Sequence, residues 1–313
     1  MANDKVMPDN EYDIGERSYH SVKGAQYTLP NDAAEHHRLE TQAVHLSALM
    51  DDNIIHSPIT RPVRKVLDVG CGTGIVTDVL AKQYPTAKVF GLDLTPVPTI
   101  KGRQVSPNIT FVQGDILNLD ESSKDGGGLL PNGTAAVKEG GFDLIYSRLL
   151  LAGMYNWPEY LRTAQSLLSP GTGWVEIHDL DWHWYDADNK IISNDWKWFT
   201  TLRQAAEERG LDYECGSRTA GWMKDAGLVD ITVKVYRWPW GGQWEEKEHM
   251  RAFGNYYVPA MKKMLWYNIP KVTEHKGYSE EQIGTWRKQM IEDFEPAKGK
   301  HWKFYVTCGR RPE

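Results

Sequence analysis

The stretch Val66-Leu67-Asp68-Val69-Gly70-Cys71-Gly72-Thr73-Gly74 places an apolar strand and an acidic residue directly before three glycines at alternate positions. Glycine allows positive φ angles and a close approach of the backbone to a ligand. A dinucleotide-binding turn has the spacing G-x-G-x-x-G/A, but here Gly74 comes one residue early and Ile75 takes the sixth position. Asp68, two residues before the first glycine, suits a cationic amino-acid head group better than a pyrophosphate. The stretch therefore predicts a nucleoside-cofactor crevice in an α/β fold.

The composition excludes several classes of function. The 313 residues carry a formal net charge of −6 and no lysine or arginine block longer than a pair, so we expect no nucleic-acid partner. No apolar run reaches the roughly 18 residues of a membrane span, and no signal peptide is evident, so we expect a cytoplasmic protein without a membrane partner. The three cysteines form no C-x-x-C pair, and no spacing of Asp and His makes a metal triad. We predict no metal ion.

Strand-like and helical segments alternate along the chain. Five strands are expected at 65–69, 88–92, 109–113, 142–146 and 174–177, and two more at 229–238 and 301–308. This alternation is typical of a Rossmann-like, doubly wound sheet, so we expect an α/β fold with seven strands. The predicted domains are an N-terminal arm and helix at 1–60, with Asn31 or Asp32 as the helix cap, and a cofactor-binding domain at 61–313. Helical cap segments are expected around 182–226 and 241–300, and a surface loop at 121–141.

Two further carboxylates follow the second and third predicted strands. Asp93 comes where a carboxylate can accept two hydrogen bonds from ribose hydroxyls. Asp115 can accept a hydrogen bond from an adenine amino group, and Ile116 can supply a backbone donor. Each acid also has an ordinary interpretation, as a helix cap for Asp93 and as turn chemistry for Asp115. Three acids at three successive strand ends favour ligand binding, because open α/β sheets bind ligands at this edge.

The D-x-G-x-G-x-G pattern and these acids resemble motifs I to III of the class I S-adenosyl-L-methionine (SAM) methyltransferases, which implies SAM as the cofactor. Four further segments carry a more specific resemblance: Arg17-Ser18-Tyr19-His20, Tyr27-x-x-Pro30-x-Asp32-x-x-Glu35-x-x-Arg38, Trp174-Val175-Glu176 and Gly309-Arg310-Arg311-Pro312. They resemble the fungal LaeA-like methyltransferases, whose members are either secondary-metabolite methyltransferases or regulators that act with protein partners. The chain lacks the long N-terminal extension of the regulators, so we expect a biosynthetic enzyme and find no protein partner indicated.

The resemblance also implies which residues hold the cofactor. The glycine turn, Asp93 and Asp115 receive its methionine, ribose and adenine parts. The N-terminal tyrosines either fold over it as a lid or only fasten the arm to the sheet. The predicted cofactor-binding residues are Tyr19, Tyr27, Asp68, Gly70, Cys71, Gly72, Gly74, Asp93, Leu94, Asp115, Ile116 and Ser147.

The ends of the fourth and fifth predicted strands are where a catalytic base is expected. Methyl transfer from a sulfonium is an in-line displacement, so positioning supplies most of the catalysis and a base is not always needed. His178 and His183 follow the fifth strand and titrate near neutral pH, which makes them the candidate bases. A hydrogen-bonded structural role is the commoner one for histidine, and both interpretations stay open.

Aromatic residues are dense in the second half of the chain. We expect a cap formed by residues 182–200 and 245–270 to close over the strand ends and hold a small-molecule acceptor that is aromatic or carries an amine. Core packing is the alternative for each aromatic side chain. The candidate wall residues are Trp182, Trp184, Tyr185, Trp196, Trp198, Tyr256, Tyr257, Trp266 and Tyr267.

The leading functional interpretation is a SAM-dependent methyltransferase that acts on an oxygen or nitrogen of a small molecule from secondary metabolism. Two alternatives stand beside it. One is a regulatory methyltransferase-like protein that works through a protein partner, and the other is a SAM-fold protein that catalyses a non-methylating cyclisation. Only the leading interpretation predicts a methylated small molecule, whereas a regulator needs an exposed docking face for its partner.

Overall fold

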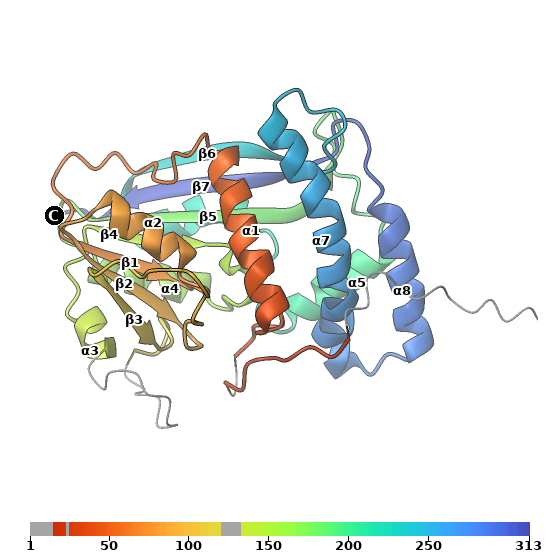
Figure 1. Cartoon of the computed structure of the whole chain (residues 1–313), viewed down its shortest axis with the longest axis horizontal. Coiled ribbons are helices and arrows are strands. Elements are labelled where there is room, and N and C mark those ends of the chain that lie inside the picture. Colours follow the sequence, from red (N-terminus) through yellow and green to blue (C-terminus); the bar gives the residue numbers. More distant parts are fainter. Residues whose placement is uncertain (1–14, 23–24, 120–132) are drawn as a thin grey trace, which may run out of the picture.

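The computed structural model describes residues 15–22, 25–119 and 133–313, and its strands form one sheet of seven (Figure 1). The strand order is β3-β2-β1-β4-β5-β7-β6, and β7 runs antiparallel to both of its neighbours while the others are parallel. The predicted seven-stranded, Rossmann-like sheet is confirmed. Its strands are β1 (Lys65–Val69), β2 (Lys88–Asp93), β3 (Ile109–Gln113), β4 (Leu144–Arg148), β5 (Trp174–Tyr185), β6 (Val229–Pro239) and β7 (His301–Arg310).

Helices α1, α2 and α7 lie over one face of the sheet, and α4 and α6 lie over the other (Figure 1). Within the described ranges, no helix combines the length and the apolar character that a membrane crossing requires. Of the loop expected at 121–141, residues 121–132 lie outside the described part, and the rest contains a short helix, α3. The helices are α1 (Ala33–Leu49), α2 (Ile75–Gln83), α3 (Gly133–Lys138), α4 (Trp157–Leu167), α5 (Lys197–Glu207), α6 (Cys215–Asp225), α7 (Glu248–Thr273) and α8 (Glu280–Asp293), with 3-10 turns η1 (Leu150–Ala152) and η2 (Glu274–Lys276).

Helix α1 begins after Asp32, as one of the two predicted caps requires. The Asp32 side chain accepts a hydrogen bond from the backbone N–H of Glu35 at 3.0 Å, which satisfies one of the free donors at the helix start. Arg17 Nε donates to Asp32 Oδ2 at 2.7 Å. The same carboxylate thus caps the helix and fastens the N-terminal arm to it.

Strand β5 is longer than expected from the sequence. The prediction that it ends at Ile177 is wrong, because β7 pairs with it as far as Tyr185 and all 12 of its residues are buried. The polar residues from His178 to His183, expected to follow the strand, lie inside it. The cost of their burial is reduced because they have hydrogen-bond partners within the sheet or on the elements that cover it.

Aromatic rings pack together where the carboxyl ends of β5 and β6 meet the amino end of β7. The ring of Trp184 lies 5.0 Å from those of Trp302 and Phe294 and 5.3 Å from that of Trp240, measured between centroids. These side chains are fully buried, so they are core residues, and of them only Trp302 also reaches the pocket described below. We call this cluster the tryptophan core; it comprises Trp184, Trp198, Trp238, Trp240, Trp302 and Phe294.

Helix α7 contains two prolines, Pro259 and Pro270. A proline inside a helix has no N–H to donate, so the carbonyl four residues earlier loses its helical partner. For Pro270 that carbonyl belongs to Trp266, and it accepts a hydrogen bond from Arg287 Nε of α8 at 2.8 Å instead. The outer helix α8 therefore completes the hydrogen bonding of α7.

Gly254 is a position where α7 packs closely against the loop before it. A Cβ at this position would lie 2.5 Å from the carbonyl carbon of Gly241 and 2.8 Å from the backbone nitrogen of Gly242. We predict that Gly254→Ala lowers the free energy of unfolding by about 1–3 kcal/mol, because backbone must move to make room.

The matched control is Gly284→Ala in α8, where a Cβ meets nothing within 4 Å. This change should raise the free energy of unfolding by about 0.5–1 kcal/mol, since alanine favours a helix interior over glycine. Urea unfolding of both variants, followed by circular dichroism, measures the difference. Equal effects would contradict the close packing of α7.

Candidate functional site

The glycine turn, Gly70–Gly74, joins β1 to α2 at the carboxyl edge of the parallel strands. Gly70, Gly72 and Gly74 have φ angles of +70°, +55° and +77°, which residues with a side chain rarely adopt. The backbone N–H groups of Gly70 and Cys71 donate to the carbonyl oxygen of Leu92 at 2.8 and 3.1 Å. The turn is thereby held against the end of β2.

The space around the glycine turn differs between its end at Gly74 and its middle at Gly72. A Cβ at Gly74 would lie 2.7 Å from the ring of Phe111, so this end is closed by a side chain of β3. A Cβ at Gly72 would have Leu39 Cδ1 of α1 as its nearest neighbour, at 3.8 Å. The middle of the turn thus has room for a ligand against its backbone, which fits the predicted cofactor.

Asp93 and Asp115 meet at this same edge. Asp93 Oδ2 accepts a hydrogen bond from the N–H of Gly72 at 2.9 Å, and its Oδ1 accepts from the N–H of Thr95 at 2.9 Å. Residues 94–108 form no helix, so the helix-cap interpretation of Asp93 is wrong. Asp115 Oδ1 accepts from the N–H of Leu117 at 2.9 Å, as in ordinary turn chemistry. Leu94 and Ile116 follow these acids on the same edge.

Asp68 lies beneath the glycine turn and is buried. Its Oδ2 accepts a hydrogen bond from Thr77 Oγ1 of α2 at 2.6 Å. Burial raises the pKa of the Asp68 carboxyl to about 7, although the Thr77 bond and the nearby Arg148 oppose the shift. A cationic group bound above the turn would favour the carboxylate form again.

Glu40 of α1 connects the helix to the glycine turn, and it is not among the residues predicted from the sequence. Its carboxylate accepts hydrogen bonds from Thr73 Oγ1 and from Arg103, which also donates to the carbonyl of Thr73. Its neighbour Leu39 faces Gly72 from the same helix. The signal that could have found Glu40 is its position beside Leu39 in a helix that had to cover the turn.

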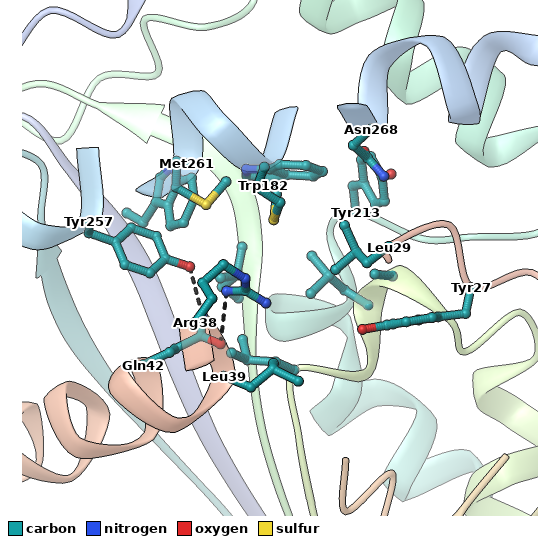
Figure 2. A pocket seen from close by; sticks show the side chains of 16 residues that line it. Tyr27, Leu29, Arg38, Leu39, Gln42, Trp182, Tyr213, Tyr257, Met261 and Asn268 are labelled. Atoms are coloured by element: carbon teal, nitrogen blue, oxygen red, sulfur yellow. Dashed lines mark hydrogen bonds between the residues drawn. The ribbon is translucent and has the colours of Figure 1, made fainter. Parts of the chain in front are cut away.

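A pocket lies between α1, α7 and the carboxyl ends of β4 and β5 (Figure 2). Leu39 both lines it and faces the glycine turn, so the pocket and the turn are adjacent. Its walls are mostly apolar and aromatic, with polar groups from α1 and α7. The lining residues are Tyr27, Leu29, Arg38, Leu39, Gln42, Leu149, Leu151, Ala152, Leu180, Trp182, Tyr213, Tyr257, Met261, Met264, Asn268 and Trp302.

Trp182 and Tyr257 are the predicted wall residues that line this pocket. Trp184 and Trp198 are buried in the tryptophan core and do not line the pocket, so core packing is the interpretation that holds for them. The pocket is instead lined from α7 by Met261, Met264 and Asn268. The other predicted wall residues do not line it: Tyr185, Trp196, Tyr256, Trp266 and Tyr267.

The remaining predicted cofactor residues are spread over three places. Tyr27 lines the pocket, and burial raises the pKa of its hydroxyl. The ring of Tyr19 lies instead against α7, 5.3 Å from Lys271 Nζ. Ser147 is fully buried beside Tyr160 of α4, on the opposite face of the sheet from α1. Tyr27 is therefore the one of these three residues that lies at the pocket.

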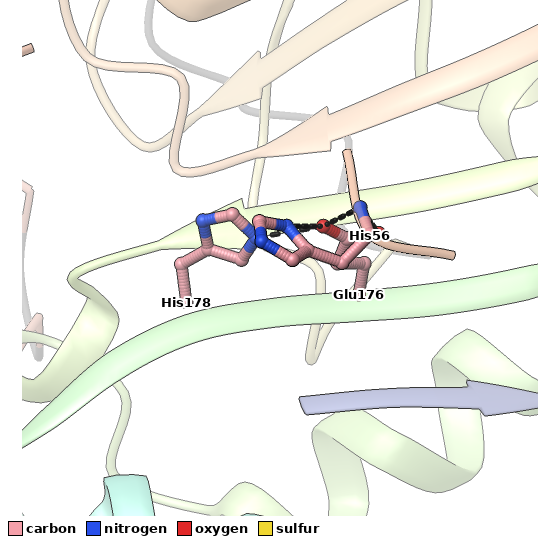
Figure 3. A group of neighbouring side chains, drawn as sticks. All are labelled: His56, Glu176 and His178. Carbon is pink, nitrogen blue, oxygen red and sulfur yellow. Dashed lines mark hydrogen bonds and ion pairs between the residues drawn. The ribbon is translucent and has the colours of Figure 1, made fainter. Parts of the chain in front are cut away.

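His178 lies inside β5 in a buried cluster with Glu176 and His56 (Figure 3). Its Nε2 is 2.7 Å from Glu176 Oε1, and its Nδ1 is 3.1 Å from the hydroxyl of Tyr146. Glu176 also accepts from the N–H of His56 at 2.9 Å and from Ser57 Oγ at 2.6 Å. Burial raises the pKa of Glu176, but the bonds from both histidines outweigh it and hold this pKa below its usual range.

The residue types of this cluster are those of a metal site, but the spacing is that of hydrogen bonds. Two atoms bound about 2.0–2.1 Å from one tetrahedral zinc ion lie about 3.3–3.4 Å apart. The 2.7 Å between His178 Nε2 and Glu176 Oε1 is shorter than this. We interpret the cluster as an anchor that ties segment 54–57 to β5.

His183 points to the opposite face of β5. Its Nε2 is 2.9 Å from Glu214 Oε1 and 3.1 Å from Arg203 Nη1, between α5 and α6. Neither His178 nor His183 lines the pocket, and burial lowers the pKa of His178. The placement of both at a strand end is wrong, and this geometry favours structural roles for them.

The part of the sequence that contains the glycine turn, Asp93 and Asp115 matches a known protein family. A sequence profile described as "Methyltransferase domain" matches residues 41–233. The chain belongs to this methyltransferase family. Its cofactor is SAM, and the glycine turn with its open flank at Gly72 fits that group.

Two relatives illustrate the range of this methyltransferase family. "Secondary metabolism regulator LAE1" of Cochliobolus heterostrophus is 28% identical over 248 residues, which cover 77% of this chain and 74% of the relative. "Methyltransferase pytC" of Aspergillus terreus is 24% identical over 287 residues, covering 90% and 82%. Among solved structures, geranyl diphosphate C-methyltransferase of Streptomyces coelicolor A3(2) aligns with a TM-score of 0.43 and 14% identity, over 94% of this chain and 92% of that one.

Asp93→Ala tests the assignment of the ribose site. We predict that it weakens SAM binding by about 1.5–3 kcal/mol, the scale of lost hydrogen bonds to a charged group, without unfolding the protein. Calorimetric titration with SAM measures the change, and the exposed Asp188→Ala is the control. Unchanged affinity in Asp93→Ala would mean that the ribose binds elsewhere.

Asp179 generates a pH-dependent prediction. It is buried in β5, accepts a hydrogen bond from the N–H of the pocket residue Leu151 at 3.2 Å, and burial raises its pKa to about 7. Because this exceeds the unfolded value of about 3.9, the folded protein binds more protons between pH 4 and 7, and stability falls as the pH rises through this range.

Asp179→Asn should remove this contribution, which amounts to up to about 1.4 kcal/mol per pH unit. Urea unfolding at pH 5, 6 and 7 compares the slopes of the variant and the parent protein. The exposed Asp195→Asn serves as the control and should leave the slope unchanged. A slope for Asp179→Asn equal to that of the parent would show that Asp179 is ionised in the folded protein.

Proposed function

We propose that this methyltransferase transfers the methyl group of SAM to an oxygen or nitrogen of a small molecule that binds in the pocket between α1 and α7. The observation that carries the proposal is the position of this pocket directly beside the glycine turn. Small-molecule sites have mostly apolar walls with a few polar groups, as this pocket has. The likeness to the relative named methyltransferase pytC supports an enzyme of this kind.

The proposed cofactor contacts follow from the edge of the sheet. Gly70, Gly72 and Gly74 offer backbone to the methionine part, Asp93 accepts from the ribose and Asp115 from the adenine. Tyr27 lies at the pocket, where it can close over the bound cofactor. SAM supplies an electrophilic methyl group, and the chain supplies its position relative to the acceptor.

The catalytic contribution of the chain is positioning and exclusion of water. Holding a nucleophile in line with a leaving group supplies up to about 7–11 kcal/mol in ideal intramolecular cases. Apolar walls such as Trp182, Met261 and Met264 keep water from the reacting atoms. We do not assign a base to His178 or His183, since both are bonded to partners away from the pocket.

A regulatory role through a protein partner is the second candidate. It is supported by the likeness to the relative named secondary metabolism regulator LAE1. A role in secondary metabolism would suit either candidate, and the cytoplasmic location expected from the sequence stays a prediction. So does the third alternative, a non-methylating cyclisation.

Incubation with SAM and a metabolite extract separates these functions. We expect a gain of 14 mass units in at least one small molecule, detected by mass spectrometry, together with S-adenosylhomocysteine. Heat-denatured protein is the control. The absence of any methylated product, together with a stable protein partner in pull-down experiments, would overturn the enzymatic proposal in favour of the regulatory one.

A further inference from the structure

One end of the pocket is rich in hydrogen-bond donors. Arg38 donates from Nε and Nη2 to the carboxylate of Glu35, with Nη2 to Oε1 at 2.6 Å, and from Nη1 to Gln42 Oε1 at 3.3 Å. A guanidinium has five N–H groups, so these bonds to described residues leave one N–H on each Nη atom. The two together can form a fork toward the pocket.

Tyr257 adds a further donor at the same end. Its hydroxyl oxygen accepts a hydrogen bond from Gln42 Nε2 at 2.7 Å, which leaves the hydroxyl hydrogen to be donated. Figure 2 shows Arg38, Gln42 and Tyr257 converging from α1 and α7. We call these three residues the donor end of the pocket.

The charges around the donor end favour an oxygen anion over an ammonium group. Arg38 is the charged residue among those lining the pocket, and no carboxylate lines it within the described ranges. The nearest carboxylate, Glu35, is buried and has both oxygens bonded to Arg38. A buried ammonium ion would therefore lack a partner, which is costly, whereas an oxygen anion would meet a fork that matches it.

We propose that the donor end binds an acidic oxygen of the acceptor, so that the substrate is a carboxylic acid or a phenol and not an amine. This inference rests on the proposed function and specifies its substrate class. The acceptor oxygen, bound as its anion, forms a bond to the methyl group while the bond from methyl to sulfur breaks and its electron pair goes to sulfur. The acidic proton has already passed to water, so no base has to line the pocket.

Two probes of the same shape test the charge preference. 2-Naphthoate carries a carboxylate, and 2-naphthylmethylamine carries an ammonium group at pH 7.5. We expect calorimetric titrations of the protein with S-adenosylhomocysteine present to show at least tenfold tighter binding of the naphthoate. Equal affinities, tighter binding of the amine, or no binding of either probe would overturn the proposal.

Paired variants test whether Arg38 is the cause. Glu35→Gln combined with Arg38→Gln removes the guanidinium without leaving the buried carboxylate unpaired. It should abolish the tenfold preference and change the Kd of S-adenosylhomocysteine by less than twofold. Glu159→Gln combined with Arg162→Gln is the matched control, since this exposed pair has the same i,i+3 spacing on α4. The control should keep the preference.

The readouts separate failure of this inference from failure of the proposed function. If the Glu35 and Arg38 variant loses affinity for S-adenosylhomocysteine but keeps the probe preference, Arg38 serves the cofactor's own carboxylate and the inference is overturned. A parent protein that does not bind S-adenosylhomocysteine would contradict the proposed function itself. Binding of the cofactor product with a preference for the amine would contradict the substrate class alone.

Discussion

The buried carboxylate of Glu176 holds the site together. Hydrogen bonds from His56 and Ser57 tie the segment after α1 to β5, so the helix is fixed over the strand edge. One flank of α1 then faces the glycine turn through Leu39 and Glu40, and the other faces the pocket through Arg38 and Gln42. The cofactor edge and the pocket owe their relative position to this one helix. A carboxylate with so many donors is costly to disturb, because each would be left unpaired in the interior.

The polar residues of β5 look like catalytic residues in the sequence but have structural roles in the fold. The side chains of Glu176 and His178 lie on the face of β5 toward α1, while those of Asp179 and His183 lie on the face toward α6. All of them are bonded to neighbouring elements. This agrees with the proposed catalysis by positioning, because the sulfonium of SAM departs as a neutral thioether and needs no acid to assist it.

The sequence predicted the sheet because strand periodicity, glycine spacing and the strand-end acids are local patterns. All seven strands are present in the structure. Asp32, one of the two residues expected to cap α1, does so. The pocket was predicted only in part, since Trp182 and Tyr257 line it but Trp184 does not. Which aromatic side chain faces a cavity depends on how far β5 extends, and that depends on its pairing with β7, more than 100 residues later in the chain. Long-range pairing of this kind leaves no local signal.

The proline at position 270 gives the outer helix an influence on the pocket. Arg287 of α8 bonds the carbonyl of Trp266 that Pro270 leaves without a helical partner, and Met264 and Asn268 on either side line the pocket. A side chain that does not line the pocket is thus bonded to the segment of α7 that does. Divergence toward new acceptors can therefore act through α8, and a comparison of lining residues alone would understate how far two such enzymes differ in specificity.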